Sequence, residues 1–111
     1  TLLDNVAKGL SDGQRGKILE WTMKSGSEAV QTAGVSYYLH QQNQLGQDSS
    51  EIAYMSSNAL ANLSDQELKA LPKHFRNLIQ HNVKTYWDSL YHAYTDERKK
   101  LGQQVDRLDR L

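Results

Sequence analysis

Apolar residues recur every three or four positions along most of the chain, and no stretch sustains the alternation of apolar and polar residues that is typical of a β-strand. Intervals of three and four place side chains on one face of an α-helix. The pattern therefore predicts an all-α fold. The first 71 residues carry four short apolar stripes. In chain order these are Leu3, Val6, Ala7 and Leu10; Ile18, Leu19, Thr22 and Met23; Val30, Ala33 and Tyr37; and Ile52, Met55, Ala59, Leu60 and Leu63.

Helix-capping signals separate these stripes. A serine followed three residues later by glutamine or glutamate can form a capping box, in which each side chain bonds to a free backbone N–H of the other residue. Gly46 is suited to end a helix, and Pro72 disfavours helical geometry at Leu71. Several short helices are therefore expected before residue 72. The candidate capping boxes are Ser11 with Gln14, Ser25 with Glu28, and Ser64 with Glu67.

After Pro72 the chain contains no glycine or proline until Gly102. The apolar stripe of this region consists of Phe75, Ile79, Val83, Tyr86, Leu90, Tyr94, Leu101, Val105 and Leu108. This pattern predicts one long amphipathic helix over residues 72–111. We therefore expect a single helical domain over residues 1–111. It would be a small helical bundle of about five helices, in which residues 1–71 form the shorter helices and one long C-terminal helix completes the fold.

Aromatic residues are concentrated in the middle of the predicted long helix. The stretch TYWDSLYHAY, residues 85–94, holds four of the nine aromatic residues of the chain (two Trp, six Tyr and one Phe). Trp87 falls at the edge of the apolar stripe and Tyr91 lies beyond it, so the apolar surface is wider than one packing contact requires. The two rings could be edge residues of the core. Alternatively, they form a docking surface, because Trp, Tyr and Arg concentrate binding energy at interfaces.

The end of the chain favours the docking interpretation. Tyr94, Leu101 and Leu108 are seven residues apart, which resembles the heptad spacing of a coiled coil, although Glu97 and Gln104 are poor residues for its seam. A seam through Val105 is equally consistent with the sequence. We therefore predict that this helix pairs with a second copy or with another protein. The predicted interaction residues are Trp87, Tyr91, Tyr94, Arg98, Leu101 and Leu108.

Composition and charge narrow the class of partner. Hydrophobic residues make up 38% of the chain, below the roughly 45–50% of an ordinary globular domain, which is consistent with a thin bundle or with a core that a partner completes. Thirteen basic residues balance 13 acidic ones, which weighs against duplex nucleic acid as the main partner. A binder of single-stranded nucleic acid stays as an alternative function, because aromatic and basic side chains together can stack bases.

The chain contains no cysteine, which excludes disulfides, thiolate metal sites and a cysteine nucleophile. This composition is consistent with a cytoplasmic location. No apolar run approaches the roughly 20 residues of a membrane-spanning helix, so no membrane partner is expected. Because the chain begins at Thr1 rather than at methionine, we expect it to be processed or excised from a longer protein.

Histidines and one aspartate share an arc of the predicted long helix opposite its apolar stripe. Asp88 and His92 are four residues apart and could bind a divalent metal ion if another element supplied more ligands. The structural alternative is a solvated face with a carboxylate–imidazole pair. His74 and His81 lie too far along the axis to share an ion with this pair, because each residue adds about 1.5 Å.

His81 and Lys84 have the H-x-x-K spacing that resembles the phospho-accepting histidine of histidine phosphotransfer bundles, in which a lysine follows three residues later. The resemblance implies a phosphoryl-accepting helical bundle and is confined to these positions. Thr85 stands where that family prefers glycine, and the bulky Tyr86 and Trp87 follow where small residues are expected. This departure places the phosphoryl-accepting alternative in doubt.

Sequence signals of catalysis are weak. Residues 9–13, GLSDG, match the letters of G-x-S-x-G, but the expected capping box accounts for Ser11 and no strand is expected before it. The chain has no glycine-rich phosphate loop and no H-E-x-x-H motif. We therefore predict a non-catalytic protein–protein interaction module with an adaptor, chaperone-like or regulatory role. It would need no cofactor, and no small-molecule substrate is identified. No role follows from the sequence for the polar connector, residues 41–50.

Overall fold

The computed structural model describes residues 11–46, 49–91 and 95–111. Within these residues the chain forms six helices and no strand, so the predicted all-α class is confirmed. The short helix expected around Leu3 to Leu10 lies outside the described residues. None of the described helices has the length and apolar composition needed to cross a membrane. The helices are α2 (Asp12–Lys24), α3 (Glu28–Leu45), α4 (Ser50–Ala61), α5 (Asp65–Ala70), α6 (Lys73–Ser89) and α7 (Asp96–Asp109).

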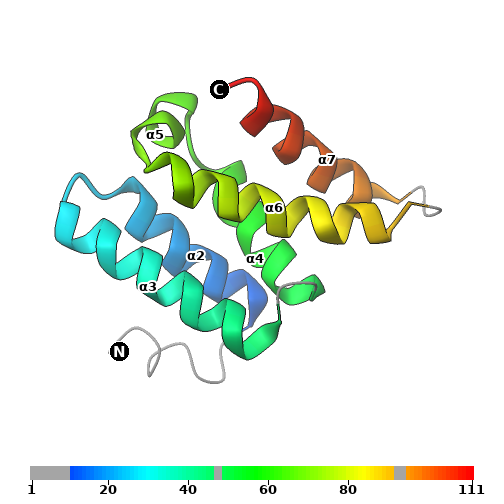
Figure 1. The fold of residues 1–111 in the computed structure, drawn as a ribbon, viewed down its shortest axis with the longest axis horizontal. Helices are drawn as coiled ribbons and strands as arrows, with labels where there is room; N and C mark the ends of the chain where they lie inside the picture. Colours follow the sequence, from blue (N-terminus) through cyan, green and yellow to red (C-terminus); the bar gives the residue numbers. More distant parts are fainter. Residues whose placement is uncertain (1–10, 47–48, 92–94) are drawn as a thin grey trace.

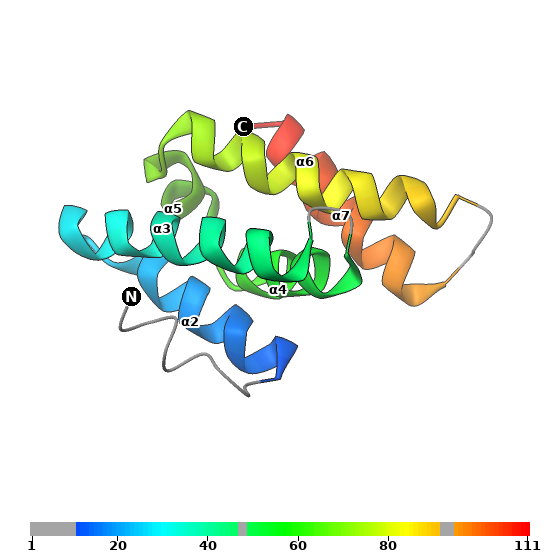
Figure 2. The ribbon, with the colours of Figure 1, turned by 60° about the horizontal axis from the view of Figure 1, so that its bottom comes forward.

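Two antiparallel helical hairpins enclose α4. Helices α2 and α3 form one hairpin, α6 and α7 form the other, and the short α5 leads into the second (Figures 1 and 2). Helix α4 packs against α2, α3, α6 and α7, and buried residues lie on most of its circumference. The core therefore surrounds α4, and its largest fully buried side chains are Tyr37, Tyr38, Phe75, Leu19, Ile52, Met55, Leu60, Leu68, Ile79 and Leu101.

The prediction of one long helix over residues 72–111 is wrong. Helix α6 ends at Ser89, and a separate helix begins at Asp96, with Thr95 as its N-cap. The Thr95 hydroxyl accepts a hydrogen bond from the backbone N–H of Arg98 at 3.1 Å. A threonine cap followed by Asp96 and Glu97 is favourable at a helix N-terminus, because acidic side chains interact with the positive end of the helix dipole. The hairpin also buries apolar residues of α7 that a straight rod would expose.

Serine caps fix most of the other boundaries. The capping boxes predicted at Ser11 and Ser64 are confirmed, with both reciprocal hydrogen bonds present in each. The box predicted at Ser25 is wrong, because Ser27 caps α3 and accepts from the backbone N–H of Val30 at 3.4 Å. Gly46 ends α3 with φ of +92°, a backbone conformation that favours glycine.

A buried polar network joins α3, α4 and α6 at the centre of the molecule. The Asn82 side-chain amide donates to the Tyr38 hydroxyl at 2.9 Å and to the Gln42 side-chain oxygen at 2.6 Å. The Tyr38 and Ser56 hydroxyls lie 2.8 Å apart, and the Tyr38 ring meets Phe75 edge-on at 5.6 Å. Burial raises the pKa of Tyr38, and its hydrogen bonds to Ser56 and Asn82 partly offset this effect. The network positions three helices against one another.

Candidate interaction site at the end of the α6–α7 hairpin

An arginine–tryptophan stack lies where α6 and α7 meet near the turn of their hairpin. The guanidinium carbon of Arg98 lies 4.3 Å from the centroid of the Trp87 ring, which is a cation–π contact. The absence of a side chain at Gly102 permits the close approach of α7, because a Cβ there would lie 2.9 Å from the Trp87 indole nitrogen. The half-buried Trp87 ring therefore packs between Arg98 and the backbone at Gly102.

Tyr91 follows the end of α6 at the same end of the hairpin, and 71% of its surface is exposed. Tyr37 and Tyr38, in contrast, are fully buried. A large exposed ring at the same end of the hairpin as the stacked tryptophan and arginine is suited to protein recognition, since Trp, Tyr and Arg are the residues enriched at binding hot spots. We call Trp87, Tyr91 and Arg98 the aromatic end.

A tyrosine of α4 anchors the first turn of α7 next to the aromatic end. The Tyr54 hydroxyl donates to a carboxylate oxygen of Glu97 at 3.0 Å, and its ring meets Tyr86 edge-on at 5.5 Å. Burial is the main cause that raises the pKa of Tyr54, and the neighbouring Tyr86 and Glu97 raise it further. These contacts fix the helix that carries Arg98 to the core.

Two surface hollows flank α4. One, of about 210 Å³, is lined by Tyr54, Ser57, Asn58, Glu97, Lys100 and Leu101. The other, of about 250 Å³, lies between α2 and α4 and is lined by Gly13, Gly16, Lys17, Glu20, Asn58, Ala61 and Asn62. Both are smaller than the roughly 300–1,000 Å³ of a typical small-molecule pocket.

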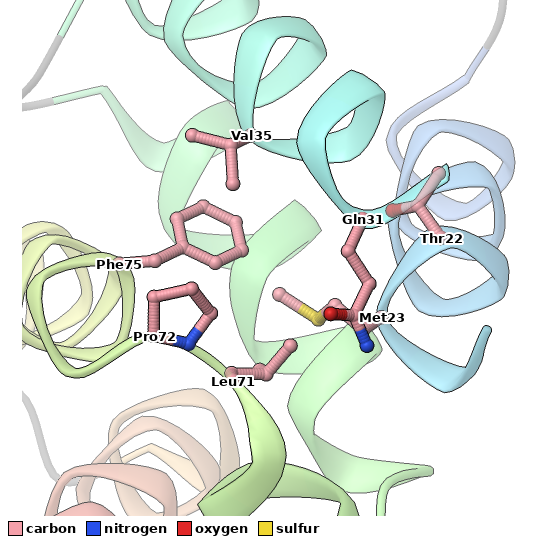
Figure 3. Close-up of a pocket in the computed structure, with 7 residues that line it drawn as sticks. All are labelled: Thr22, Met23, Gln31, Val35, Leu71, Pro72 and Phe75. Atoms are coloured by element: carbon pink, nitrogen blue, oxygen red, sulfur yellow. The ribbon is translucent and has the colours of Figure 1, made fainter. Parts of the chain in front are cut away.

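A third hollow is a narrow apolar notch where the α2–α3 hairpin meets the start of α6. Figure 3 shows Met23, Val35 and Phe75 converging on it from three helices. Its volume of about 10 Å³ is close to the minimum for one water molecule. The notch is therefore too small to hold a substrate.

The structure divides the six predicted interaction residues into three groups. Trp87 and Arg98 are in contact, and Tyr91 is exposed at the same end of the hairpin. Tyr94 lies outside the described residues. Leu101 and Leu108 are 1% and 9% exposed and belong to the core of the chain itself. Their expected place on a docking surface is corrected, because the hairpin turns this face of α7 towards α6 and α4.

The residues considered for phosphoryl or metal chemistry lie on the outside of α6. His81 and Lys84 are both exposed, as is Asp88. His92, the partner expected for Asp88, lies outside the described residues. Over residues 11–46, 49–91 and 95–111, no three His, Asp or Glu side chains are close enough together to hold a metal ion. The described side chains thus supply no shared ligand set.

Sequence reasoning missed the contact between Tyr54 and Glu97, which are 43 positions apart. No periodic or capping signal links these two residues, so only the tertiary arrangement reveals the contact. It also missed Trp21 on α2, whose side chain is 59% exposed. Comparisons of the chain with known protein families, with curated proteins and with solved structures gave no match.

Proposed function

We propose that the protein is a non-catalytic interaction module that binds another protein chain through the aromatic end. The observation that carries this proposal is the 71% exposure of Tyr91 at the end of the hairpin where Arg98 stacks on Trp87. Adaptor, chaperone-like and regulatory roles all need such a surface and no bond-making step.

Preorganisation supports binding at this end. A side chain that is mobile before binding loses conformational entropy when a partner fixes it, which costs about 0.5–1.5 kcal/mol. The stack between Trp87 and Arg98 removes part of this cost, because the two side chains restrain each other in the free protein. Tyrosine and tryptophan also supply a large contact area with few rotatable bonds.

The surroundings of the aromatic end resemble the rim of a protein interface. Glu97, Lys99 and Lys100 are exposed on the adjoining turns of α7 and present both signs of charge. Polar rims around an aromatic centre are typical of interfaces, and rim charges influence the association rate and the choice of partner. A protein surface is therefore a better match for this end than a small molecule.

A photo-reactive phenylalanine analogue at position 91 tests the proposal in cells that make the protein. We expect one discrete cross-linked product whose second component is a single protein, identified by mass spectrometry. The same analogue at position 21 is the matched control, since Trp21 is also an exposed aromatic residue and lies on α2.

The Arg98→Gln substitution should reduce the yield from position 91, because it removes the contact that holds Trp87. Identical products from positions 21 and 91, or none from position 91, would contradict the proposal.

A further inference from the structure

The outward face of α7 carries a stripe of exposed polar residues. They recur at intervals of three and four, so they lie on one side of the helix. The opposite side holds Leu101, Val105 and Leu108, which are buried in the core. The stripe faces solvent along the whole 14-residue helix. Its residues are Asp96, Lys99, Gln103, Asp106 and Arg110, the last of which is the C-cap.

The order of charges along this stripe is negative, positive, neutral, negative, positive. When the stripe is read in the opposite direction, each charged position carries the opposite charge. An antiparallel copy of α7 therefore places Asp96 opposite Arg110 and Lys99 opposite Asp106, and each pair occurs twice. Gln103 meets its own counterpart, and a primary amide can both donate and accept a hydrogen bond. A parallel copy would place like charges together at all four charged positions.

We propose that α7 pairs with α7 of a second copy of this chain, antiparallel and about a two-fold axis at Gln103. This inference rests on the proposed function and names the partner. The arrangement brings the end of the hairpin that carries Tyr91 beside the end of α7 that carries Arg110 in the other copy. The aromatic end and the charged stripe then contribute to one symmetric interface.

Two other basic residues of α7 flank the charged stripe, and each lies against other parts of its own molecule. Lys100 lines the hollow beside Tyr54. The Arg107 side chain donates to the backbone carbonyl of Leu60 at 2.7 Å, to the Asp65 carboxylate at 2.9 Å and to the carbonyl of Leu63. These contacts hold Arg107 against the end of α4, so it does not bring its charge opposite Lys100 of the second copy.

Association through this face is expected to be weak and sensitive to salt. A 14-residue helix is only about 21 Å long, and exposed ion pairs are screened by dissolved ions. We expect a dissociation constant on the order of 0.1 mM at low salt, typical of a small and transient interface. Raising the salt concentration should weaken the dimer several-fold.

Charge reversal provides a test with built-in rescue. In Lys99→Glu, each new carboxylate faces Asp106 of the other copy, and in Asp106→Lys each new ammonium group faces Lys99. Each variant alone should associate at least about tenfold more weakly than the unmodified chain in sedimentation velocity. An equimolar mixture of the two variants should recover association, because the negative charge at position 99 of one variant then faces the positive charge at position 106 of the other.

Lys100→Glu is the matched control. It makes the same charge change one residue away, on a side chain that lines the Tyr54 hollow, and should leave association within about threefold of the unmodified chain. Circular dichroism should show equal helicity for all variants, since each altered side chain is exposed.

Three results would overturn the pairing: an unmodified chain that stays monomeric at about 1 mM, unchanged association of Lys99→Glu, or a mixture that does not recover. If Tyr91→Ala abolishes association while both charge variants leave it intact, the α7 pairing fails and the aromatic end stands. If the charge variants act as expected while position 91 gives no cross-link, the pairing stands and the proposed role of the aromatic end fails.

Discussion

Tyr38 and Tyr91 place the same side chain in two opposite settings. Tyr38 is fully buried, and its hydroxyl is hydrogen-bonded to Ser56 and Asn82 at the junction of α3, α4 and α6. Tyr91 is 71% exposed at the end of the α6–α7 hairpin. Asn82, which bonds to Tyr38, lies on α6, and Tyr91 follows the end of the same helix, so α6 connects the two settings.

The comparison separates residues that stabilise the fold, such as Tyr38, from residues that are available for binding, such as Tyr91. A buried polar group without a partner costs about 1–3 kcal/mol, so the hydrogen bonds of Tyr38 to Ser56 and to the Asn82 amide are needed for the packing of three helices. Tyr91 is mostly exposed to solvent, so no such cost of burial applies to it. Substitutions in the network should therefore change the free energy of unfolding, while substitutions at the aromatic end should change binding.

The largest expected effect follows Asn82→Ala. This change removes the hydrogen bonds to Tyr38 and Gln42, leaves the Gln42 oxygen without its donor and opens a void among buried residues. We expect the free energy of unfolding in urea to fall by about 3 kcal/mol.

Two controls accompany this measurement. Asn77→Ala changes an exposed asparagine on the same helix as Asn82, and Tyr91→Ala removes the exposed ring. Each should lower the free energy of unfolding by less than about 0.5 kcal/mol. A loss at Tyr91 that equals the loss at Asn82 would show that the hairpin end is structural and would remove the distinction between the two regions.

The sequence predicted helices well because their signals are local. Ser11 and Ser64 lie three residues before Gln14 and Glu67, and these boxes need no information from distant parts of the chain. The hairpin was missed because both α6 and α7 bury their apolar faces in one core, so the stripe keeps its spacing across the turn. Thr95 was the local signal that could have revealed the break.

The candidate site depends partly on residue type and partly on the tertiary arrangement. Trp87 contacts Arg98 and Tyr91 is exposed, while the docking role that the aromatic cluster predicts for them stays a prediction. The burial of Leu101 and Leu108 depends on how the hairpin folds back, which residue spacing does not specify. The order of exposed charges on α7 acquires meaning only once the structure shows which face is outward.

A smaller effect is expected from Arg98→Gln, which removes the cation–π contact with Trp87. The free energy of unfolding should fall by about 0.5–1 kcal/mol. In a Trp21→Phe background, Trp87 is the sole tryptophan of the chain, so a red shift of its fluorescence reports a more hydrated ring. Lys84→Gln, which changes an exposed cation on α6, should alter neither quantity. An unshifted spectrum for Arg98→Gln would mean that other contacts hold the indole.

The smallest expected effect is on the pH dependence of the free energy of unfolding. It is tested by comparing substitutions of Tyr54 and Tyr91. Burial, Tyr86 and Glu97 raise the pKa of Tyr54 in the folded chain above the ordinary value of 10.0. Above pH 10 the unfolded chain therefore loses a proton that the folded chain keeps, and the free energy of unfolding declines as pH rises. In Tyr54→Phe this decline should be shallower by about 0.5 kcal/mol per pH unit, a value reduced for solvent access to the ring.

Urea unfolding between about pH 8 and pH 11 measures this slope, with Tyr91→Phe as the control that removes an exposed hydroxyl. The control should decline in parallel with the unmodified chain. If Tyr54→Phe does so as well, the link from α4 to the first turn of α7 is open to water. Arg98 would then be presented by a loosely held helix, and the aromatic end would lose the preorganisation that favours binding there.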